Sequence, residues 1–172
     1  MEQEQKVVDP YRFLPPGLAA WVRSFIGEED YKGQIPWTPL KKPLSQCTVS
    51  MITSAGISLK SDPPFDMERE KREPLWGDRS YRVIPRGTTS QDIDVNHLHI
   101  NTNWIKQDIN VMLPMQRMEE FEKEGVIGRL STSCYSFYGF QWQSTEFLDT
   151  AISPMAEKMG REGVDAVLLF PA

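Results

Sequence analysis

The protein is a chain of 172 residues with a formal net charge of −5, of which 40% are hydrophobic and 25% are charged. This is the composition of an ordinary soluble globular protein, and the length suits one domain with a substantial core. The acidic balance argues against a nucleic-acid partner, because phosphate backbones favour basic surfaces.

Membrane and export signals are also missing from the sequence. A membrane span needs roughly 20 consecutive apolar residues, and the acidic segment 1–5 does not resemble a signal peptide. We therefore expect a cytoplasmic protein with no membrane partner. Cys47 and Cys134 lie far apart and predict reduced thiols rather than a disulfide framework.

Residues 1–43 are predicted to form an N-terminal arm that contains one amphipathic helix. The apolar face of this helix recurs at helical spacing and consists of Leu18, Trp21, Val22, Phe25 and Ile26. Two interpretations stay open: the face packs on the domain that follows, or it docks on another subunit. Residues 35–40 are predicted to be extended, because prolines push the residues before them out of the helical region.

A first strand is predicted over residues 47–52, at the start of the main domain. The turn after it contains Thr53, Ser54, Ala55 and Gly56. Such small residues let a ligand approach the backbone and can leave N–H groups free to bind an anion. These four residues are therefore candidates for substrate binding, although many similar turns bind nothing.

Residues 61–79 are predicted to form a surface loop, and residues 81–85 a short strand that ends at a proline. The segment 94–103 holds both histidines of the protein. If it is extended, His97 and His99 face the same side. Asp94 could join them in a metal site, but no cysteine or further histidine is near. A hydrogen-bonding role toward substrate, shared with Asn101, or toward the backbone is the favoured interpretation.

The second half of the chain predicts two helices and two more strands. One helix begins near Pro114 and ends at Gly125, and it follows a short apolar stretch, 108–114, that fits a strand or a helix entry. A strand is predicted over residues 127–137. The last helix carries the stripe Phe147, Ala151, Met155 and Met159 and is kinked or shortened by Pro154.

The final strand, residues 164–170, is nearly all apolar and predicts a strand buried on both faces inside a parallel sheet. Strands that alternate with helices predict an α/β fold: a three-layer, open, mostly parallel sheet with helices on both faces, plus the N-terminal helical arm. The turns after Ile52, Phe137 and Phe170 should then meet at one edge. Ligands bind in open α/β sheets at the carboxyl ends of the strands.

Five stretches together resemble a known family. They are 53–60, 77–85, His97 followed by 108–110, 124–128 leading to 135–139, and 162–169. Residues 44–172 resemble the selenoprotein B family of glycine, sarcosine and betaine reductases, together with the selenoprotein subunit of D-proline reductase. In this family the last strand runs into a selenocysteine or cysteine, so we expect a selenocysteine just after Ala172 and a domain, 44–172, that is truncated at its C-terminus.

The resemblance implies reductive cleavage of a C–N bond in a small amine or amino acid. It implies attack by a selenolate, a substrate carried as an imine on a pyruvoyl group of a partner subunit, and a dithiol or thioredoxin-like reductant. We therefore expect an oligomeric assembly in which this chain alone is inactive. The alternative is a non-catalytic α/β module for small-molecule binding or subunit docking.

Candidate residues follow from the turns and from this resemblance. His97, His99 and Asp108 are expected to orient the substrate, and Cys134 is a candidate resolving thiol whose favoured interpretation is a small buried apolar residue. The substrate-binding candidates are Thr53, Ser54, Ala55, Gly56, Asn101, Tyr135, Ser136 and Gly139. His99 and residues 101–103 depart from the D-proline reductase pattern, which leaves the substrate open.

Overall fold

A computed structural model describes residues 10–25, 38–73, 76–139, 141 and 144–172 of the chain. The chain divides into two compact units, residues 1–38 and 39–172. In the first unit, a 3-10 turn, η1 (Pro10–Phe13), precedes helix α1 (Pro16–Phe25). The predicted helix is confirmed as far as Phe25, whereas Ile26 and residues 35–37 lie outside the described residues. Leu18 and Trp21 on its predicted apolar face are exposed.

The second unit contains a sheet, a hairpin and several short helices. Its elements in chain order are η2 (Leu44–Gln46), β1 (Thr48–Thr53), β2 (Ile57–Leu59), α2 (Met67–Arg72), β3 (Tyr81–Pro85), β4 (Ile93–Val95), α3 (Asn103–Gln107), η3 (Ile109–Val111), α4 (Met115–Lys123), β5 (Arg129–Leu130), β6 (Ser133–Phe137), α5 (Ser144–Phe147), the π-helical segment η4 (Leu148–Ile152), α6 (Ser153–Arg161) and β7 (Ala166–Phe170).

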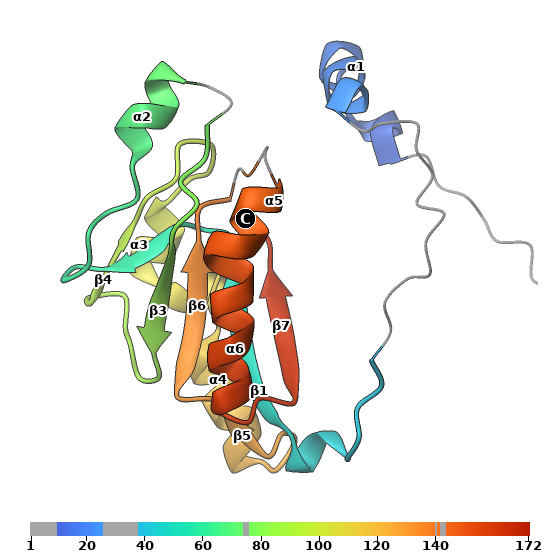
Figure 1. Ribbon diagram of the computed structural model, residues 1–172, viewed down its shortest axis with the longest axis vertical. Coiled ribbons are helices and arrows are strands. Elements are labelled where there is room, and N and C mark those ends of the chain that lie inside the picture. The colour runs from blue at the N-terminus through green and yellow to red at the C-terminus, as the bar shows by residue number, and fades with distance from the viewer. Residues whose placement is uncertain (1–9, 26–37, 74–75, 140, 142–143) are drawn as a thin grey trace, which may run out of the picture. The chain divides into compact units, whose positions relative to one another are not determined.

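Strand β1 is the centre of the sheet. It pairs in parallel with β7 on one side and with β5 and β6 on the other, and β3 runs antiparallel along β6. The arrowheads of β6 and β7 point to the same end of the domain, and that of β3 points the opposite way (Figure 1). The Ser54 N–H donates to the Phe170 carbonyl at 3.2 Å and the Gly56 N–H to the Phe137 carbonyl at 3.0 Å. The predicted meeting of the three turns is confirmed.

Alternating side chains build one core on each face of the sheet. In β6, Cys134 belongs to a cluster with residues of α3, α4 and the antiparallel hairpin β2–β4, while Tyr135 belongs to a second cluster with residues of α5, η4 and α6. Figure 1 shows α6 on one face and α4 on the other. The three-layer α/β architecture is confirmed.

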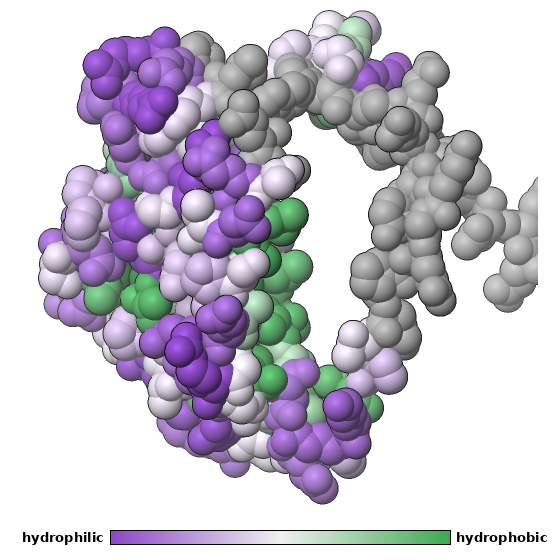
Figure 2. Space-filling view, in the orientation of Figure 1, coloured by the Kyte–Doolittle hydropathy of each residue, from purple (hydrophilic) through white to green (hydrophobic). Residues whose placement is uncertain are grey.

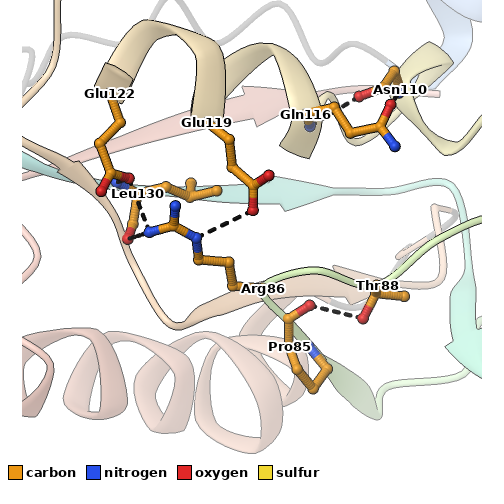
Figure 3. A network of polar contacts seen from close by, with 8 residues as sticks. All are labelled: Pro85, Arg86, Thr88, Asn110, Gln116, Glu119, Glu122 and Leu130. Atoms are coloured by element: carbon orange, nitrogen blue, oxygen red, sulfur yellow. Dashed lines mark hydrogen bonds and ion pairs between the residues drawn. The ribbon is translucent and has the colours of Figure 1, made fainter. Parts of the chain in front are cut away.

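Arg86 ties helix α4 to the sheet at the end opposite the three turns. Its Nε lies 3.1 Å from Glu119 Oε1 and its Nη1 lies 2.8 Å from Glu122 Oε2. Glu122 also accepts from the Leu130 N–H at 2.9 Å. Figure 3 shows the guanidinium between these two carboxylates and the Leu130 backbone. The network fixes how α4 lies against β3 and β5.

The interruption of the last apolar run by Asp165 has a structural reason. Its Oδ2 accepts from the Thr48 N–H at 2.8 Å and lies 2.8 Å from Lys42 Nζ. Asp165 therefore joins the start of β7 to the start of β1 and to Lys42.

Several local predictions are corrected by the structure. The predicted loop 61–79 contains helix α2, which is capped by Asp66 accepting from the Arg69 N–H at 2.9 Å. The predicted strand 127–137 is two strands, β5 and β6. Of the two alternatives for the stretch 108–114, the strand is wrong and the helix entry agrees with the structure, in which η3 leads into α4. Pro154 lies in the first turn of α6, where a missing N–H costs little, and the π-helical segment precedes it.

The prediction of a final strand buried on both faces is wrong for the described part of the chain, in which β7 pairs with β1 alone. Leu169 is 71% exposed, and Val167 and Leu168 are also exposed. Figure 2 shows apolar side chains gathered along this edge. Apolar side chains indicate that a strand tends to be buried, but they do not determine how many neighbouring strands or helices cover that strand. Among the described helices, none is both long enough and apolar enough to cross a membrane.

Candidate functional site

The turn after β1 lies where the parallel strands end. The Thr53 hydroxyl donates to the Phe170 carbonyl at 3.0 Å, and the Ala55 N–H donates to Thr53 Oγ1 at 3.2 Å. The N–H groups of Ser54 and Gly56 donate to β7 and β6, as described above. The expectation of N–H groups free to bind an anion is therefore wrong, because all three are used within the protein. The turn presents instead the side chain of Ser54, whose Oγ accepts from the Ala172 N–H at 2.8 Å.

Gly56 holds the end of hairpin β2–β4 against this turn. Its φ is +64°, and a Cβ atom there would lie 2.0 Å from the Asn96 carbonyl oxygen. The Asn96 N–H donates to the Gly56 carbonyl at 2.8 Å, and the Asn96 amide donates to Ser58 Oγ at 2.9 Å. These contacts give Gly56 a positioning role: they place the residue after Asn96, His97, beside the sheet edge.

His97 and His99 lie next to each other on a bent segment. The backbone N–H of His99 donates to Nδ1 of His97 at 3.1 Å, and the ring centroids are 6.0 Å apart. Because Nδ1 of His97 accepts this bond, the neutral ring carries its proton on Nε2. Burial, assisted by the neighbouring His99, lowers the pKa of His97 below its ordinary value of 6.5. His97 is therefore a neutral donor at neutral pH.

Three segments distant in sequence meet at Gly139. The His97 ring stacks on the Tyr138 ring with centroids 5.5 Å apart. A Cβ atom on Gly139 would lie 2.8 Å from His97 Nε2 and 2.9 Å from the Ser54 carbonyl oxygen. Only a residue without a side chain allows this approach. Ser54, His97 and Gly139, three residues predicted for the site, are thus brought together.

A buried carboxylate lies behind the histidines. Glu70 of α2 is only 3% exposed. Its Oε1 lies 2.9 Å from His99 Nε2, and its Oε2 accepts a hydrogen bond from the Tyr138 hydroxyl. Glu70, His99 and Tyr138 therefore form one connected polar group.

An apolar pocket of about 350 Å³ adjoins the same edge. It lies at the carboxyl ends of β1, β6 and β7, and Ser54 is one of the residues that line it. The residues that line it are Ile52, Ser54, Phe137, Ile152, Leu169, Phe170 and Pro171. Ser54 therefore joins this pocket to the group around His97 and Gly139.

Three other predicted residues are buried inside the layers of the domain. Cys134 lies in the core on the α4 side, and burial raises the pKa of its thiol to about 12. Tyr135 points into the opposite core, beneath α6. Ser136 Oγ accepts from the Ile57 N–H at 2.7 Å and is fully buried. These contacts are structural, and they favour the interpretation of Cys134 as a small buried apolar residue.

Asp108 and Asn101 shape the segment that follows the histidines. Asp108 Oδ1 accepts from the Asn110 N–H at 2.9 Å and from its side-chain amide at 2.7 Å, and these bonds lower the pKa of Asp108. Asn101 Oδ1 accepts from the Asn103 N–H at 3.1 Å at the start of α3. In the structure both side chains cap local turns.

The described residues contain no group of three or more His, Cys, Asp or Glu side chains placed to hold a metal ion. Asp94 lies in β4, exposed and opposite Ser58 in the hairpin register.

Comparison with known proteins decides the family. Residues 30–171 match the family of glycine/sarcosine/betaine reductase selenoprotein B. The chain belongs to this family. It is 36% identical over 133 residues to D-proline reductase subunit gamma of Acetoanaerobium sticklandii, and the aligned region covers 77% of this chain and 52% of the relative. It is 29% identical over 138 residues to glycine reductase complex component B subunit gamma of Carboxydothermus hydrogenoformans, and this aligned region covers 79% of this chain and 30% of the relative.

A third relative in the family is sarcosine reductase complex component B subunit beta of Peptoclostridium acidaminophilum, 27% identical over 138 residues, or 79% of this chain and 30% of the relative. The chain thus spans about half or less of the length of these relatives. No solved structure matches it.

The sequence analysis did not identify two residues of the candidate site, Glu70 and Tyr138. The charged segment around Glu70 offered a weak signal: the capping Asp66, acidic residues in the first turn and basic residues in the last turn are typical of a short helix. However, nothing in the sequence separates Glu70 from Glu68, whose carboxylate pairs with Lys71 at the surface. Only packing shows which carboxylate turns inward.

Proposed function

We propose that this chain is part of a reductase component that binds a small amine or amino acid and takes part in reductive cleavage of its C–N bond. Membership of the selenoprotein B family supports this proposal, as do relatives named as subunits of D-proline, glycine and sarcosine reductases. The observation that carries it is the meeting of Ser54, His97 and Gly139 at the edge where β1, β6 and β7 end.

Each part of this edge suits one part of such a substrate. The neutral His97 ring carries its proton on Nε2 and can donate to a carboxylate. The Ser54 hydroxyl can donate or accept, so it can hold either a carboxylate or an amine. The apolar wall formed by residues such as Phe137 and Phe170 can pack against the carbon skeleton. The pocket volume of about 350 Å³ leaves room for a small molecule.

The redox chemistry is proposed to come from groups outside the described residues. The family resemblance implies a selenocysteine or cysteine after Ala172, a pyruvoyl group on a partner subunit, and a dithiol or thioredoxin-like reductant. The position of Ala172 fits the first of these, because its N–H contacts Ser54 at the pocket. The residues of this chain would then bind and orient the substrate beside the nucleophile.

The test begins with the gene. The codon after Ala172 and the frame beyond it are read, and the complete product is expressed together with the partner subunits that the same genome encodes for a reductase of this kind. Oxidation of a dithiol is then measured with glycine, sarcosine, betaine and D-proline. We expect turnover with at least one amine and a loss of 10-fold or more for Ser54→Ala and His97→Ala. Ser61→Ala, at an exposed serine, is the matched control and should keep wild-type turnover.

An assembled complex that binds an amine but turns over none of them would instead favour the alternative of a non-catalytic binding or docking module. Wild-type turnover in both Ser54→Ala and His97→Ala would remove these residues from the proposed site.

A further inference from the structure

We propose that Glu70, Tyr138 and His99 form a proton-transfer group at the rim of the site. In this group Nδ1 of His99 exchanges a proton with a basic nitrogen of the bound molecule, while Glu70 and Tyr138 are positioning residues. The proposal rests on the proposed function and deepens it, because it names the residue that serves the nitrogen of the substrate.

The burial of Glu70 is the first observation. The other paired acids of the α2 segment lie at the surface with cations: Glu68 pairs with Lys71, and Glu73 pairs with Arg69. Glu70 is 3% exposed, and its two oxygens instead meet an imidazole and a phenol. Burying a carboxylate is unfavourable unless hydrogen bonds replace water. Glu70 is therefore held in place by the two donors that it orients.

The two nitrogens of His99 are the second observation. Nε2 lies 2.9 Å from Glu70 Oε1, so the neutral ring donates Nε2–H to the carboxylate and keeps a lone pair on Nδ1. The His99 side chain is 65% exposed, although its partner is buried. A buried carboxylate that fixes the tautomer of an accessible imidazole is the arrangement by which general acids and bases are oriented.

The two histidines are thereby given different roles. His97 uses Nδ1 to accept from the His99 backbone and is packed between Tyr138 and Gly139, which suits it to binding. The His99 side chain is 65% exposed, and its Nε2 lies against the Glu70 carboxylate, which leaves Nδ1 for a proton transfer. Tyr138 links the two, since its ring stacks on His97 while its hydroxyl donates to Glu70.

The proposed step is a proton transfer without redox change. When the C–N bond of the substrate breaks, its electron pair stays on the departing nitrogen, which then needs a proton. Protonated His99 releases the Nδ1 proton to that nitrogen and keeps the N–H bond pair as a lone pair. The Nε2–H stays hydrogen-bonded to the Glu70 carboxylate throughout.

The experiment uses the complete gene product in its complex, with histidines labelled with nitrogen-15. Ring nitrogen spectra of the wild type should show neutral His99 as the Nε2–H tautomer. In Glu70→Gln, the charged carboxylate that favours the Nε2–H tautomer becomes a neutral amide with one acceptor oxygen in place of two. The preference of His99 for that tautomer should weaken, so the His99 tautomers should become mixed. Glu68→Gln is the matched control on the same helix and should leave the spectrum unchanged.

Turnover provides the second readout. Removing a general acid typically slows a reaction about 10²- to 10⁴-fold. We expect a loss in this range for His99→Ala, with partial rescue by added imidazole, and a smaller loss for Glu70→Gln and Tyr138→Phe. A structural residue would not be rescued by imidazole. Wild-type tautomers in Glu70→Gln, or a His99→Ala enzyme that imidazole does not restore, would overturn the proposal.

The two proposals fail in distinguishable ways. If the wild-type complex turns over no amine, the proposed function is wrong, whereas the tautomer measurement still decides whether Glu70 orients His99. If turnover is normal in His99→Ala, the proposed function stands and the proton-transfer role is lost.

Discussion

Gly139 and His97 approach each other so closely that a methyl group on Gly139 would lie 2.8 Å from Nε2 of His97. The two residues are 42 positions apart in the sequence, one after β6 and one after β4. Their contact places a histidine from the hairpin at the edge of the sheet, and it makes the site sensitive to a single added carbon atom.

Gly139→Ala should therefore destabilise the fold and displace His97. The new methyl meets a stacked ring and the Ser54 backbone, neither of which can move freely, so we expect a cost of about 1–3 kcal/mol. Urea unfolding measures the loss, and the His97 ring signals in NMR spectra report the displacement. Gly160→Ala is the control, because a Cβ atom there meets nothing within 4 Å. It should stabilise helix α6 by about 0.5–1 kcal/mol; equal stability of the two variants would contradict the close approach.

His97 should titrate below pH 6.5, because burial opposes its charged form. At a pH between the folded-state and unfolded-state pKa values of His97, the unfolded chain therefore binds a proton more readily than the folded chain. The stability contributed by neutral His97 is fully present above about pH 6.5 and is lost as the pH falls through the folded-state pKa. Carbon-detected NMR titration of the ring gives the pKa directly. His97→Gln should lose this part of the pH dependence of unfolding, and a His97 that titrates at or above 6.5 would refute the buried neutral ring.

Arg86 should matter more than an ordinary surface arginine. Arg86→Ala leaves Glu119 and Glu122 facing each other without the cation between them (Figure 3). We expect a loss of about 1–2 kcal/mol, reduced by high salt, because the pairs are partly exposed. Arg117→Ala breaks one exposed pair with Glu120 and should cost less than about 0.5 kcal/mol. Denaturant unfolding at low and high salt separates the two variants, and similar losses would count against the network.

Leu169 should tolerate a polar substitution better than a buried leucine does. It is 71% exposed on β7, whereas Leu130 on β5 is 1% exposed. Leu169→Ser is expected to cost under about 1 kcal/mol and to reduce self-association, because it removes apolar surface from an edge strand. Leu130→Ser should cost about 3 kcal/mol or more, since it leaves both a cavity and a buried hydroxyl. Unfolding and light scattering on the purified protein check both results; strong destabilisation by Leu169→Ser would mean that β7 is covered.

Local patterns in the sequence were enough to predict the main strands of the sheet, the longer helices and the layered arrangement, but not the hairpin β2–β4 or helices α2 and α3. The strand at residues 81–85, the helix that ends before Gly125 and the turns after Ile52 and Phe137 follow from alternation, helical spacing and turn residues, all of which act over a few positions. The order of strands and helices then predicts a mostly parallel sheet whose strand ends meet at one edge. For this reason the sequence places Ser54 and Gly139 near one edge of the sheet, whereas His97 is a candidate only because of the polar segment around it and the family resemblance.

Only the tertiary structure decided which side chains face that site. Cys134, Tyr135 and Ser136 follow one another in β6, yet each points into packed protein, because β6 is covered on both faces. Glu68 and Glu70 carry the same carboxylate two positions apart on α2, and only Glu70 turns inward to His99 and Tyr138. The exposure of β7 likewise depends on neighbours that its own apolar residues do not specify. The physical reason is the same in each case: burial and hydrogen-bond partners depend on distant segments brought together by packing, which a local pattern does not contain.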